Sequence, residues 1–281
     1  MKIGIIGAGK VGVSLGRHFK KHDLNVVGIY SRKEASAQKG ADLMAVTCFE
    51  GLKEIVLESE MLFLTVPDSA IEPVWDEISQ FDLKGKIICH CSGALSSHVF
   101  QGIEQLGSWG YAAHPAMTIS HKEAEDAFQK APIVLEGAIE KWTVVRAFFE
   151  ALGHPVIRLA AVHKSLYHCA AVFSSNFVVA LAKISMDLLA KCGFSEHERP
   201  LFLPLMLRSV ENIHHHGTTN ALTGPVERGD VATIVKHLTM LETEHEQMYQ
   251  LLSQTLIEIA EIKNPNQDYK ELQEMLKKSS Q

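Results

Sequence analysis

Short apolar runs alternate with amphipathic segments over the first 158 residues. Five runs rich in Ile and Val predict buried parallel strands, at 2–7, 25–30, 61–66, 86–91 and 132–137. Between the first two runs, Val11, Leu15 and Phe19 stand at helical spacing within 10–22, which ends in basic residues as a helix C-terminus favours. Strands that alternate with helices indicate βαβ units in an α/β, doubly wound sheet.

From about residue 159 the pattern changes to helical periodicity alone. We expect helices over 160–192, 196–214, 228–242 and 244–262, followed by a polar tail to 281. The first would be about 48 Å long at 1.5 Å per residue, which suits the spine of a second domain. The sequence therefore predicts an N-terminal doubly wound Rossmann domain, 1–158, followed by an all-α C-terminal domain, 159–281.

A glycine motif, Gly7-x-Gly9-x-x-Gly12, stands between the first predicted strand and the first predicted helix. Gly7 permits the tight turn, Gly9 lets the backbone approach a pyrophosphate, and Gly12 lets the helix pack on the strand. The helix N-terminus offers free N–H groups to the anion. This predicts a dinucleotide site that also includes Lys10 and Val11. The alternative is a glycine turn with a structural role only.

The end of the second predicted strand indicates which dinucleotide binds. An acid at this place would accept hydrogen bonds from the ribose 2′-OH of NAD, whereas an arginine accommodates the 2′-phosphate of NADP. Here the chain has Ser31, Arg32 and Lys33, and Glu34 lies past the expected position. A hydroxyl, a planar guanidinium and an ammonium favour NADP(H). The alternative is a solvated basic loop.

Other strand ends are expected to line the nicotinamide end of the cofactor, because ligands of doubly wound sheets lie beyond the carboxyl ends of the strands. The further cofactor-binding candidates are Val66, Pro67, Asp68, Ser92 and Gly93. Asp68 or Ser69 could equally cap a helix. His114, before Pro115, is a candidate for substrate binding, or else a buried group with its hydrogen bonds made.

The first helix of the second domain carries polar groups on a mostly apolar surface. At helical spacing Lys164 and His168 fall on one stripe with Ala171 and Ser175, whereas Asn176 lies roughly 120° away. A lysine and a histidine that face a cofactor could bind a carboxylate and protonate a developing alkoxide. The alternative places both in solvent at the edge of the domain.

Together the glycine motif, the sequence VPD at 66–68 and the helical second domain resemble the 6-phosphogluconate dehydrogenase-like reductases. These include pyrroline-5-carboxylate reductases and ketopantoate reductases. In β-hydroxyacid dehydrogenases and ketopantoate reductases, a Lys-x-x-x-Asn on the first long helix carries catalysis. Lys164 matches that lysine, but the partner position holds His168. We expect Lys164 or His168 to supply the proton and Asn176 to orient the substrate; the departure at His168 leaves open which of the two is the donor.

Three segments carry a closer resemblance that covers nearly the whole chain: YAAHPAMT (111–118), YHCAAVFSSN (167–176) and ALTGPVERGD (221–230). They are similar to Rossmann-like proteins with a C-terminal domain of unassigned function, some of which are an alternative class of ketopantoate reductase. In the last segment Thr223, the Gly224 N–H and Arg228 are expected to hold a substrate carboxylate, with Asp230 as a helix N-cap. A capped helix connection is the alternative. Resemblance to the pyrroline carboxylate reductases also implies a homodimer through the helical domain.

Composition and charge limit the partners and the cell compartment expected for the protein. A net charge of −6 argues against general binding to nucleic acid or anionic membranes. The five cysteines form no CxxC pair, which suits a reducing cytoplasm. The apolar stretch 169–190 contains Lys183 and Asp187 and is not expected to span a bilayer. No metal is expected at the histidines 214–216, because consecutive side chains diverge on a helix.

The sequence thus predicts a cytoplasmic, NADPH-dependent reductase of a small 2-oxo acid, with ketopantoate as the first candidate. One alternative is an imine reductase resembling pyrroline-5-carboxylate reductase, although a lysine ammonium would repel its cationic substrate. The other alternative is a non-catalytic NADP-binding sensor. Hydride would pass to the carbonyl carbon, and the protein would position the reactants and stabilise the developing oxyanion.

Overall fold

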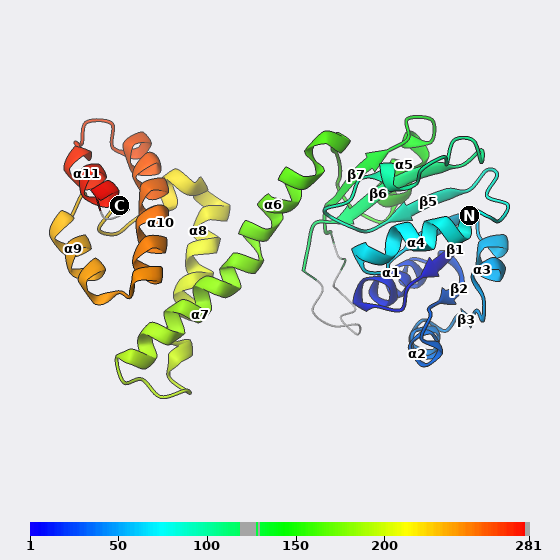
Figure 1. The fold of residues 1–281 in the computed structure, drawn as a ribbon, viewed down its shortest axis with the longest axis horizontal. Coiled ribbons are helices and arrows are strands. Elements are labelled where there is room, and N and C mark those ends of the chain that lie inside the picture. Colours follow the sequence, from blue (N-terminus) through cyan, green and yellow to red (C-terminus); the bar gives the residue numbers. More distant parts are fainter. Residues whose placement is uncertain (119–127, 129, 279–281) are drawn as a thin grey trace. The chain divides into compact units, whose positions relative to one another are not determined.

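Strand pairing organises the N-terminal part of the chain (Figure 1). The computed structural model describes residues 1–118, 128 and 130–278, and it divides into two compact units, Met1–Val178 and Val179–Gln281. Over the described residues, the first unit has one eight-stranded sheet in the order β3-β2-β1-β4-β5-β6-β7-β8. The strands are β1 (Lys2–Ile6), β2 (Asn25–Tyr30), β3 (Thr47–Cys48), β4 (Met61–Leu64), β5 (Ile87–His90), β6 (Trp109–Pro115), β7 (Ile133–Gly137) and β8 (Val156–Arg158).

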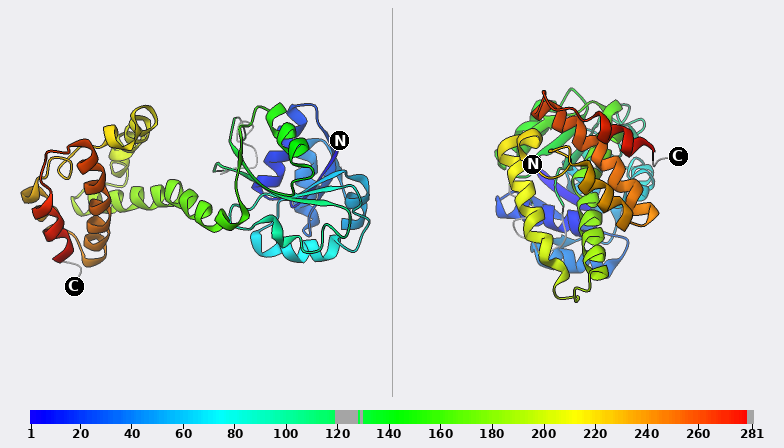
Figure 2. Two further views of the ribbon diagram at one scale, coloured as in Figure 1. Left: turned by 90° about the horizontal axis from the view of Figure 1, so that it is seen from above. Right: turned by 90° about the vertical axis from the view of Figure 1, so that its left-hand side faces the viewer.

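Helices cover both faces of this sheet, as the predicted doubly wound architecture requires (Figure 2). They are α1 (Lys10–Lys21), α2 (Glu34–Met44), α3 (Leu52–Glu58), α4 (Asp68–Ile78) and α5 (Trp142–Ala151). Side chains of α1, α2 and α5 pack with Phe63 and Tyr111 on one face. Those of α3 and α4 pack with Leu64 and Ile88 on the other face. The central strands therefore bury both of their sides, which explains the continuous apolar runs. The predicted fold class is confirmed.

The strand predictions succeed where a run is long and apolar. Four of the predicted runs form β1, β2, β4 and β5, which are mutually parallel. The fifth forms β7, but β7 pairs antiparallel with β6, so its predicted parallel direction is wrong. An apolar run indicates burial on both faces, whereas direction depends on how the chain returns to the sheet. The short β3 and β8, and β6 with its glycine, histidine and proline, gave no clear strand pattern.

The predicted single helix over 160–192 is divided. A 3-10 turn, η2 (Ala161–His163), leads into α6 (Lys164–Ser174) and then α7 (Asn176–Lys191). Between them Ser175 leaves the helical region, with φ −129° and ψ −70°, and its Oγ donates to the carbonyl oxygen of Ala171 at 2.7 Å. Such back-bonding by serine competes with the helical ladder and bends helices.

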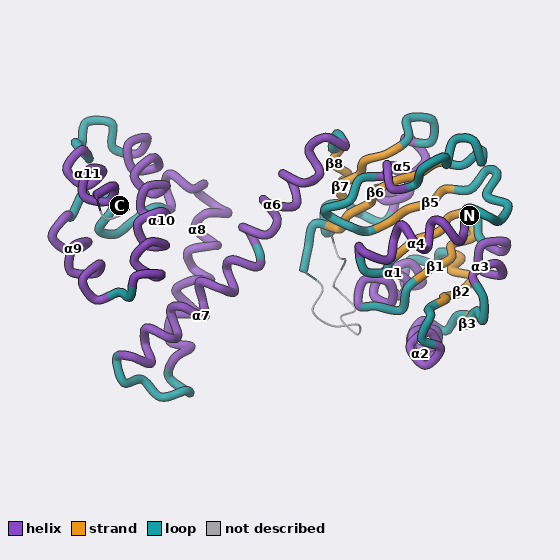
Figure 3. The backbone as a smooth tube through the Cα atoms, viewed as in Figure 1, coloured by secondary structure: helices purple, strands orange, loops and turns teal. Residues whose placement is uncertain are grey.

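The second unit is helical (Figure 3). After α7 it contains η3 (Arg199–Phe202), α8 (Leu203–Ala221), α9 (Val231–Met240), α10 (Thr243–Lys263) and α11 (Lys270–Lys278). Its core is formed by Leu222, Val226, Ile234, Leu238, Ile257, Ala260, Tyr269, Leu272 and Leu276. The helices expected at 228–242 and 244–262 are confirmed as α9 and α10. The one expected at 196–214 begins later, after the 3-10 turn, and the polar tail contains α11.

One helical stretch is notable for its exposed apolar surface. Ala161–Lys191 is long and apolar enough to cross a membrane, judged by length and composition only. Exposed apolar side chains continue on α8. Examples from both parts are Leu166, Phe173, Phe177, Val179, Leu205, Leu207 and Val210. In the described part of one chain, these side chains remain open to solvent.

Candidate active site

Packing explains two of the three motif glycines, and the third faces open space. Gly7 has φ +117°, and a Cβ there would lie 2.7 Å from the carbonyl carbon of Thr65. A Cβ at Gly12 would clash with the carbonyl oxygen of Gly7 and with Thr65 Oγ1. At Gly9 a Cβ would meet only Thr65 O, at an ordinary 3.7 Å. The described residues do not require glycine at position 9, but a ligand approaching the backbone would.

The N-terminus of α1 fits an anion. Gly9 is the N-cap, no side chain of the described residues caps the helix, and no acid lies in the first turn. The first N–H groups of the helix are therefore available, and the helix dipole favours negative charge there. Lys10 is exposed at the same end, and Val11 is half-buried beside it. The residues predicted to hold a pyrophosphate thus share one surface.

Strand pairing brings the basic segment beside this turn. The N–H of Gly7 donates to the carbonyl oxygen of Tyr30 at 2.8 Å, so the end of β2 lies against the end of β1. Ser31 follows directly, and Arg32 and Lys33 are exposed. No acid lies between β2 and α2, whose first residue is Glu34. A guanidinium, an ammonium and a hydroxyl beside a dinucleotide turn fit a 2′-phosphate.

Asp68 does not act as the helix cap that the sequence also allowed. Pro67 is the N-cap of α4, and no described side chain caps this helix. Instead, the carboxylate of Asp68 accepts a hydrogen bond from Ser92 Oγ at 2.8 Å. This contact joins the segments that follow β4 and β5. Pro67 and Asp68 are exposed, and Val66 is half-buried, at the carboxyl edge of the sheet.

Ser92 organises the segment after β5. Its Oγ accepts the N–H groups of Ala94 and Leu95 at 3.1 and 3.0 Å while it donates to Asp68. All of the hydrogen-bonding capacity of this hydroxyl is thereby used. Its carbonyl oxygen accepts a hydrogen bond from Lys164 Nζ at 2.9 Å. The structure therefore brings Lys164 of α6 to the carboxyl end of β5.

Lys164 is buried, with 2% of its surface exposed. Burial lowers its pKa, and the negative charges of Glu136 and Asp68 oppose that shift. The reading that placed Lys164 in solvent at a domain edge is wrong. A buried amine at a strand end, hydrogen-bonded to a neutral carbonyl, is typical of a group that acts on a ligand.

Two histidines converge on Gly93. A Cβ at this position would lie 2.7 Å from His168 Nδ1 and 3.0 Å from His114 Nε2, so both rings approach because the residue is glycine. His168 Nδ1 is buried and has no hydrogen-bond partner among the described residues. His114 Nδ1 is hydrogen-bonded to the hydroxyl of Tyr167 at 2.7 Å. Burial, and then the charge of Lys164, lower the pKa of His114 to about 4, so this ring is neutral at pH 7.

A cavity of about 560 Å³ opens beside these rings. Its walls come from 114–118, from α6 and from the start of α7, and they include His114, Met117, Tyr167, His168, Ala171, Ser175 and Asn176. Ideal helical spacing would have directed Asn176 away from His168. The break at Ser175 allows both to line one cavity. The volume suits a small organic substrate.

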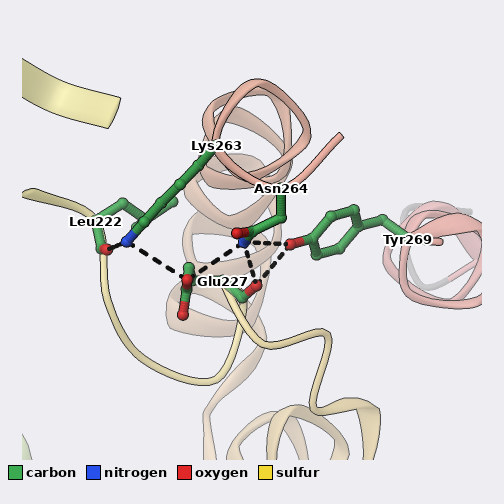
Figure 4. A network of polar contacts seen from close by, with 5 residues as sticks. All are labelled: Leu222, Glu227, Lys263, Asn264 and Tyr269. Carbon is green, nitrogen blue, oxygen red and sulfur yellow. Dashed lines mark hydrogen bonds and ion pairs between the residues drawn. The ribbon is translucent and has the colours of Figure 1, made fainter. Parts of the chain in front are cut away.

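The remaining predicted substrate residues lie in the second unit. Thr223 and Arg228 are exposed in the turn 221–230, and Gly224 has φ +105°. Side chains from the end of α10 and from the segment before α11 hold this turn in place (Figure 4). Lys263 Nζ donates to the carbonyl oxygen of Leu222 at 2.7 Å, and the hydroxyl of Tyr269 donates to that of Glu227 at 2.6 Å. The substrate-binding role of this turn stays a prediction.

The predicted N-cap of α9 is confirmed. Asp230 accepts the N–H of Thr233 at 3.0 Å and its hydroxyl at 2.7 Å. The three histidines 214–216 are exposed on α8. No group of three or more His, Cys, Asp or Glu side chains that could hold a metal ion occurs in the described part of the chain.

Three buried or half-buried polar groups around Lys164 were not singled out from the sequence: His90, Glu136 and Tyr167. Tyr167 follows Lys164 by three residues, so helical spacing could have assigned it to the same face. His90 and Glu136 interrupt the apolar runs 86–91 and 132–137, and a polar residue inside a buried strand is itself a signal.

Two protein-family models match this chain, one after the other along the sequence. Residues 1–115 match the Rossmann-like domain family, and residues 131–256 match a domain of unknown function, DUF2520. A Bacillus subtilis (strain 168) protein provisionally named 6-phosphogluconate dehydrogenase YqeC is 24% identical over 235 residues, which are 81% of this chain and 75% of that protein.

Solved structures share the fold. A provisionally named NADP oxidoreductase from Bacteroides fragilis is 26% identical with a TM-score of 0.72, covering 92% of this chain and 98% of its own. Protein TM1727 from Thermotoga maritima is 25% identical with a TM-score of 0.73, covering 93% and 99%. A reductive aminase from Aspergillus terreus, solved with NADPH and ethyl-5-oxohexanoate, is 14% identical with a TM-score of 0.61, covering 99% and 93%. The chain therefore combines a Rossmann-like N-terminal domain with a DUF2520 domain, as the resemblance in its sequence predicted.

Proposed function

We propose that this protein is an NADP(H)-dependent oxidoreductase that reduces the carbonyl group of a small 2-oxo acid, with ketopantoate as the first candidate. The observation that carries the proposal is the buried Lys164 amine, held on Ser92 O at the carboxyl end of β5. The names of the relatives, which include an NADP oxidoreductase and a dehydrogenase, support the same class.

The cofactor would be held by the glycine turn and by the basic segment after β2. Gly9 leaves room for a pyrophosphate over α1, and Arg32 would receive the 2′-phosphate, with Ser31 and Lys33 beside it. When bound, NADPH supplies the hydride for the reduction. The tip of the segment after β5, at Ser92 and Gly93, lies where the carboxyl ends of the strands meet and is the proposed border between cofactor and substrate.

The proton for the reduction would come from side chains around the cavity. Lys164 and His168 are the proposed donors to the developing alkoxide, and a charged Lys164 would also attract the carboxylate of an oxo acid. His168 Nδ1 has no partner in the described residues and can turn to a ligand. The neutral pair His114–Tyr167 offers a further hydrogen bond to the substrate oxygen. Asn176 would orient the substrate from the far side of the helix break.

An imine reductase is the second candidate. The favouring observation is that burial lowers the pKa of Lys164, because a neutral amine would tolerate a cationic imine that an ammonium repels. The reductive aminase from Aspergillus terreus supports only the shared fold at its level of identity. An NADP-binding sensor without catalysis would use the glycine turn but would leave Lys164 without a reaction.

The test is NADPH oxidation, followed by absorbance, against a panel of 2-oxo acids that includes ketopantoate, with pyrroline-5-carboxylate as the imine. We expect turnover with an oxo acid and a loss of about 10²–10⁴-fold in kcat for Lys164→Met, with NADPH binding retained. Lys183→Met, which changes an exposed lysine of α7, is the matched control and should keep full activity. Turnover by Lys164→Met equal to that of the parent would reject Lys164 as a donor, and activity with the imine alone would favour the second candidate.

We further propose that 159–281 is a substrate-binding and dimerisation domain and that the protein is a cytoplasmic homodimer. The support is the exposed apolar surface of α6, α7 and α8, which a second copy would bury. Insertion into a bilayer is disfavoured because Lys183 and Asp187, an ion pair at 2.6 Å, would enter the hydrocarbon. Sedimentation equilibrium of the full chain measures the mass: a monomer at micromolar concentration would contradict the dimer.

A further inference from the structure

Glu136 is a buried acid to which the proposed reaction gives no part. It lies on β7 with 4% of its surface exposed, and its carboxylate accepts hydrogen bonds from Ser97 N at 2.7 Å and Ser97 Oγ at 2.6 Å. In the residues that the structure describes, Glu136 forms no ion pair. A buried carboxylate held by neutral donors alone is costly unless a positive charge lies nearby.

Strand register places Glu136 in one row across the sheet with His90. Ala112 of β6 pairs with His90 on one side and with Glu136 on the other. Paired residues project from the same face, and strands lie about 4.8 Å apart, so His90 and Glu136 are roughly 10 Å apart along that face. Both side chains bond to the segment that crosses this face, the loop 92–97.

His90 and Glu136 hold this loop at both ends. The N–H of Ser92 donates to His90 Nδ1 at 3.2 Å, so the ring carries its proton on Nε2, which donates to Ser96 O at 3.2 Å. Burial lowers the pKa of His90 to about 4, so the ring is neutral. Glu136 is the acidic member of the pair. It fixes the loop through Ser97, while Lys164 docks at the other end on Ser92 O.

Lys164 is the buried amine beside this loop, and it donates its hydrogen bond to a neutral carbonyl. The titratable groups around it are Glu136 of β7, Asp68 of α4, Cys91 and His90 of β5 and its end, His114 of β6, and Tyr167 and His168 of its own helix. Of the two carboxylates, Asp68 is exposed, so solvent screens its charge, whereas Glu136 is buried. Glu136 is thus the negative charge that acts most strongly on Lys164.

We propose that Glu136 is a positioning residue for Lys164: its buried carboxylate fixes the loop 92–97 on which Lys164 docks and compensates the positive charge of the lysine. The inference rests on the proposed function for its catalytic meaning, since a charged Lys164 is what would attract an oxo acid and donate a proton. The contacts themselves do not depend on the substrate.

The test separates charge from loop geometry with Glu136→Gln and Ser97→Ala. The glutamine variant keeps the size of the side chain and loses the charge, whereas the alanine variant keeps the charge and loses one loop contact. The readout is the pH titration of the Lys164 ¹³Cε chemical shift in lysine-labelled protein, assigned with Lys164→Met. The negative charge of Glu136 raises the pKa of Lys164, and the loss of a nearby opposite charge shifts a pKa by about one unit, so Glu136→Gln should lower the titration midpoint of Lys164 by about one pH unit. In Ser97→Ala, the titration midpoint of Lys164 should stay within about 0.3 pH unit of the parent value.

An unchanged midpoint in Glu136→Gln, or an equal shift in Ser97→Ala, would overturn the proposal. If Glu136→Gln does not fold, Glu136→Asp keeps the charge and shortens the reach to Ser97: a midpoint near that of the parent supports the proposal, and a fall of about one unit overturns it. The titration needs neither cofactor nor substrate. A protein that reduces no oxo acid but shows the shift would refute the proposed function and leave the role of Glu136 standing.

Discussion

Acidification should destabilise the first unit through a buried histidine pair that lies apart from the candidate site. His18 of α1 and His154, before β8, are 3% and 2% exposed, and their Nε2 atoms are 2.8 Å apart. His154 Nδ1 donates to the carbonyl oxygen of Ala131 at 2.9 Å, so its Nε2 accepts the proton of His18 Nε2. Both rings are therefore neutral, and a further proton would place a charge among Phe19 and Phe128.

The magnitude follows from the pKa of His18. Burial, and then electrostatic interactions with His154, His22 and Lys21, lower that pKa from 6.5 to about 4. The unfolded chain therefore takes up a proton near pH 6.5, whereas the folded chain does so only near pH 4. The stability that His18 contributes is complete above the unfolded pKa and is lost as the pH falls towards the folded one. At 1.36 kcal/mol per unit, the loss between about pH 7.5 and about pH 5 is about 2 kcal/mol.

Urea unfolding followed by tryptophan fluorescence measures this loss. The three tryptophans, Trp75, Trp109 and Trp142, all lie in the first unit, so the signal reports that unit. His18→Gln removes the titrating ring, and the change in unfolding free energy over the same pH interval should shrink by about 2 kcal/mol. His98→Gln, at an exposed histidine, is the control and should retain the full change. The same pH dependence in His18→Gln as in the parent would refute the reasoning.

Further predictions concern the cofactor turn and the second unit. Gly12→Ala should destabilise the first unit by about 3 kcal/mol in urea unfolding, because the new Cβ would clash with the backbone. Gly9→Ala should leave the urea midpoint unchanged and weaken NADPH binding in calorimetry. Equal losses of stability in the two variants would contradict this prediction. Arg32→Ala should raise the KM for NADPH roughly tenfold more than that for NADH, and equal effects would remove the NADP assignment. Tyr269→Phe should cost about 1 kcal/mol in thermal unfolding followed by circular dichroism, because the Glu227 carbonyl loses its short hydrogen bond and keeps only the one from Asn264 Nδ2 at 3.4 Å; an unchanged melting temperature would refute that role.

Much of the cofactor half could be predicted because its signals are local. Each apolar run, the spacing from Gly7 to Gly12 and the basic residues after β2 are contained in short segments of the chain. A Rossmann unit follows from the order of these segments. The strand direction of β7 and the break at Ser175 could not be predicted in this way. Direction depends on the return path of the chain, and the break depends on which hydrogen bond a serine makes in context.

The candidate site shows the same limit from the chemical side. Lys164 and His168 could be singled out because they are polar residues at helical spacing on an apolar helix. The environment of these two residues could not be predicted, because Lys164 contacts Ser92, 72 positions away in sequence, and His168 lies against Gly93. The hydrogen bonds of Asp68 with Ser92 and of Glu136 with Ser97 are likewise long-range contacts.

By itself the sequence determined the order of strands and helices, the glycine turn and the residue types available for binding and proton transfer, because periodicity and turn chemistry act between near neighbours. The tertiary structure decided which of those groups are buried together. Burial and the nearest charges set protonation, and both depend on contacts between segments that only packing brings side by side.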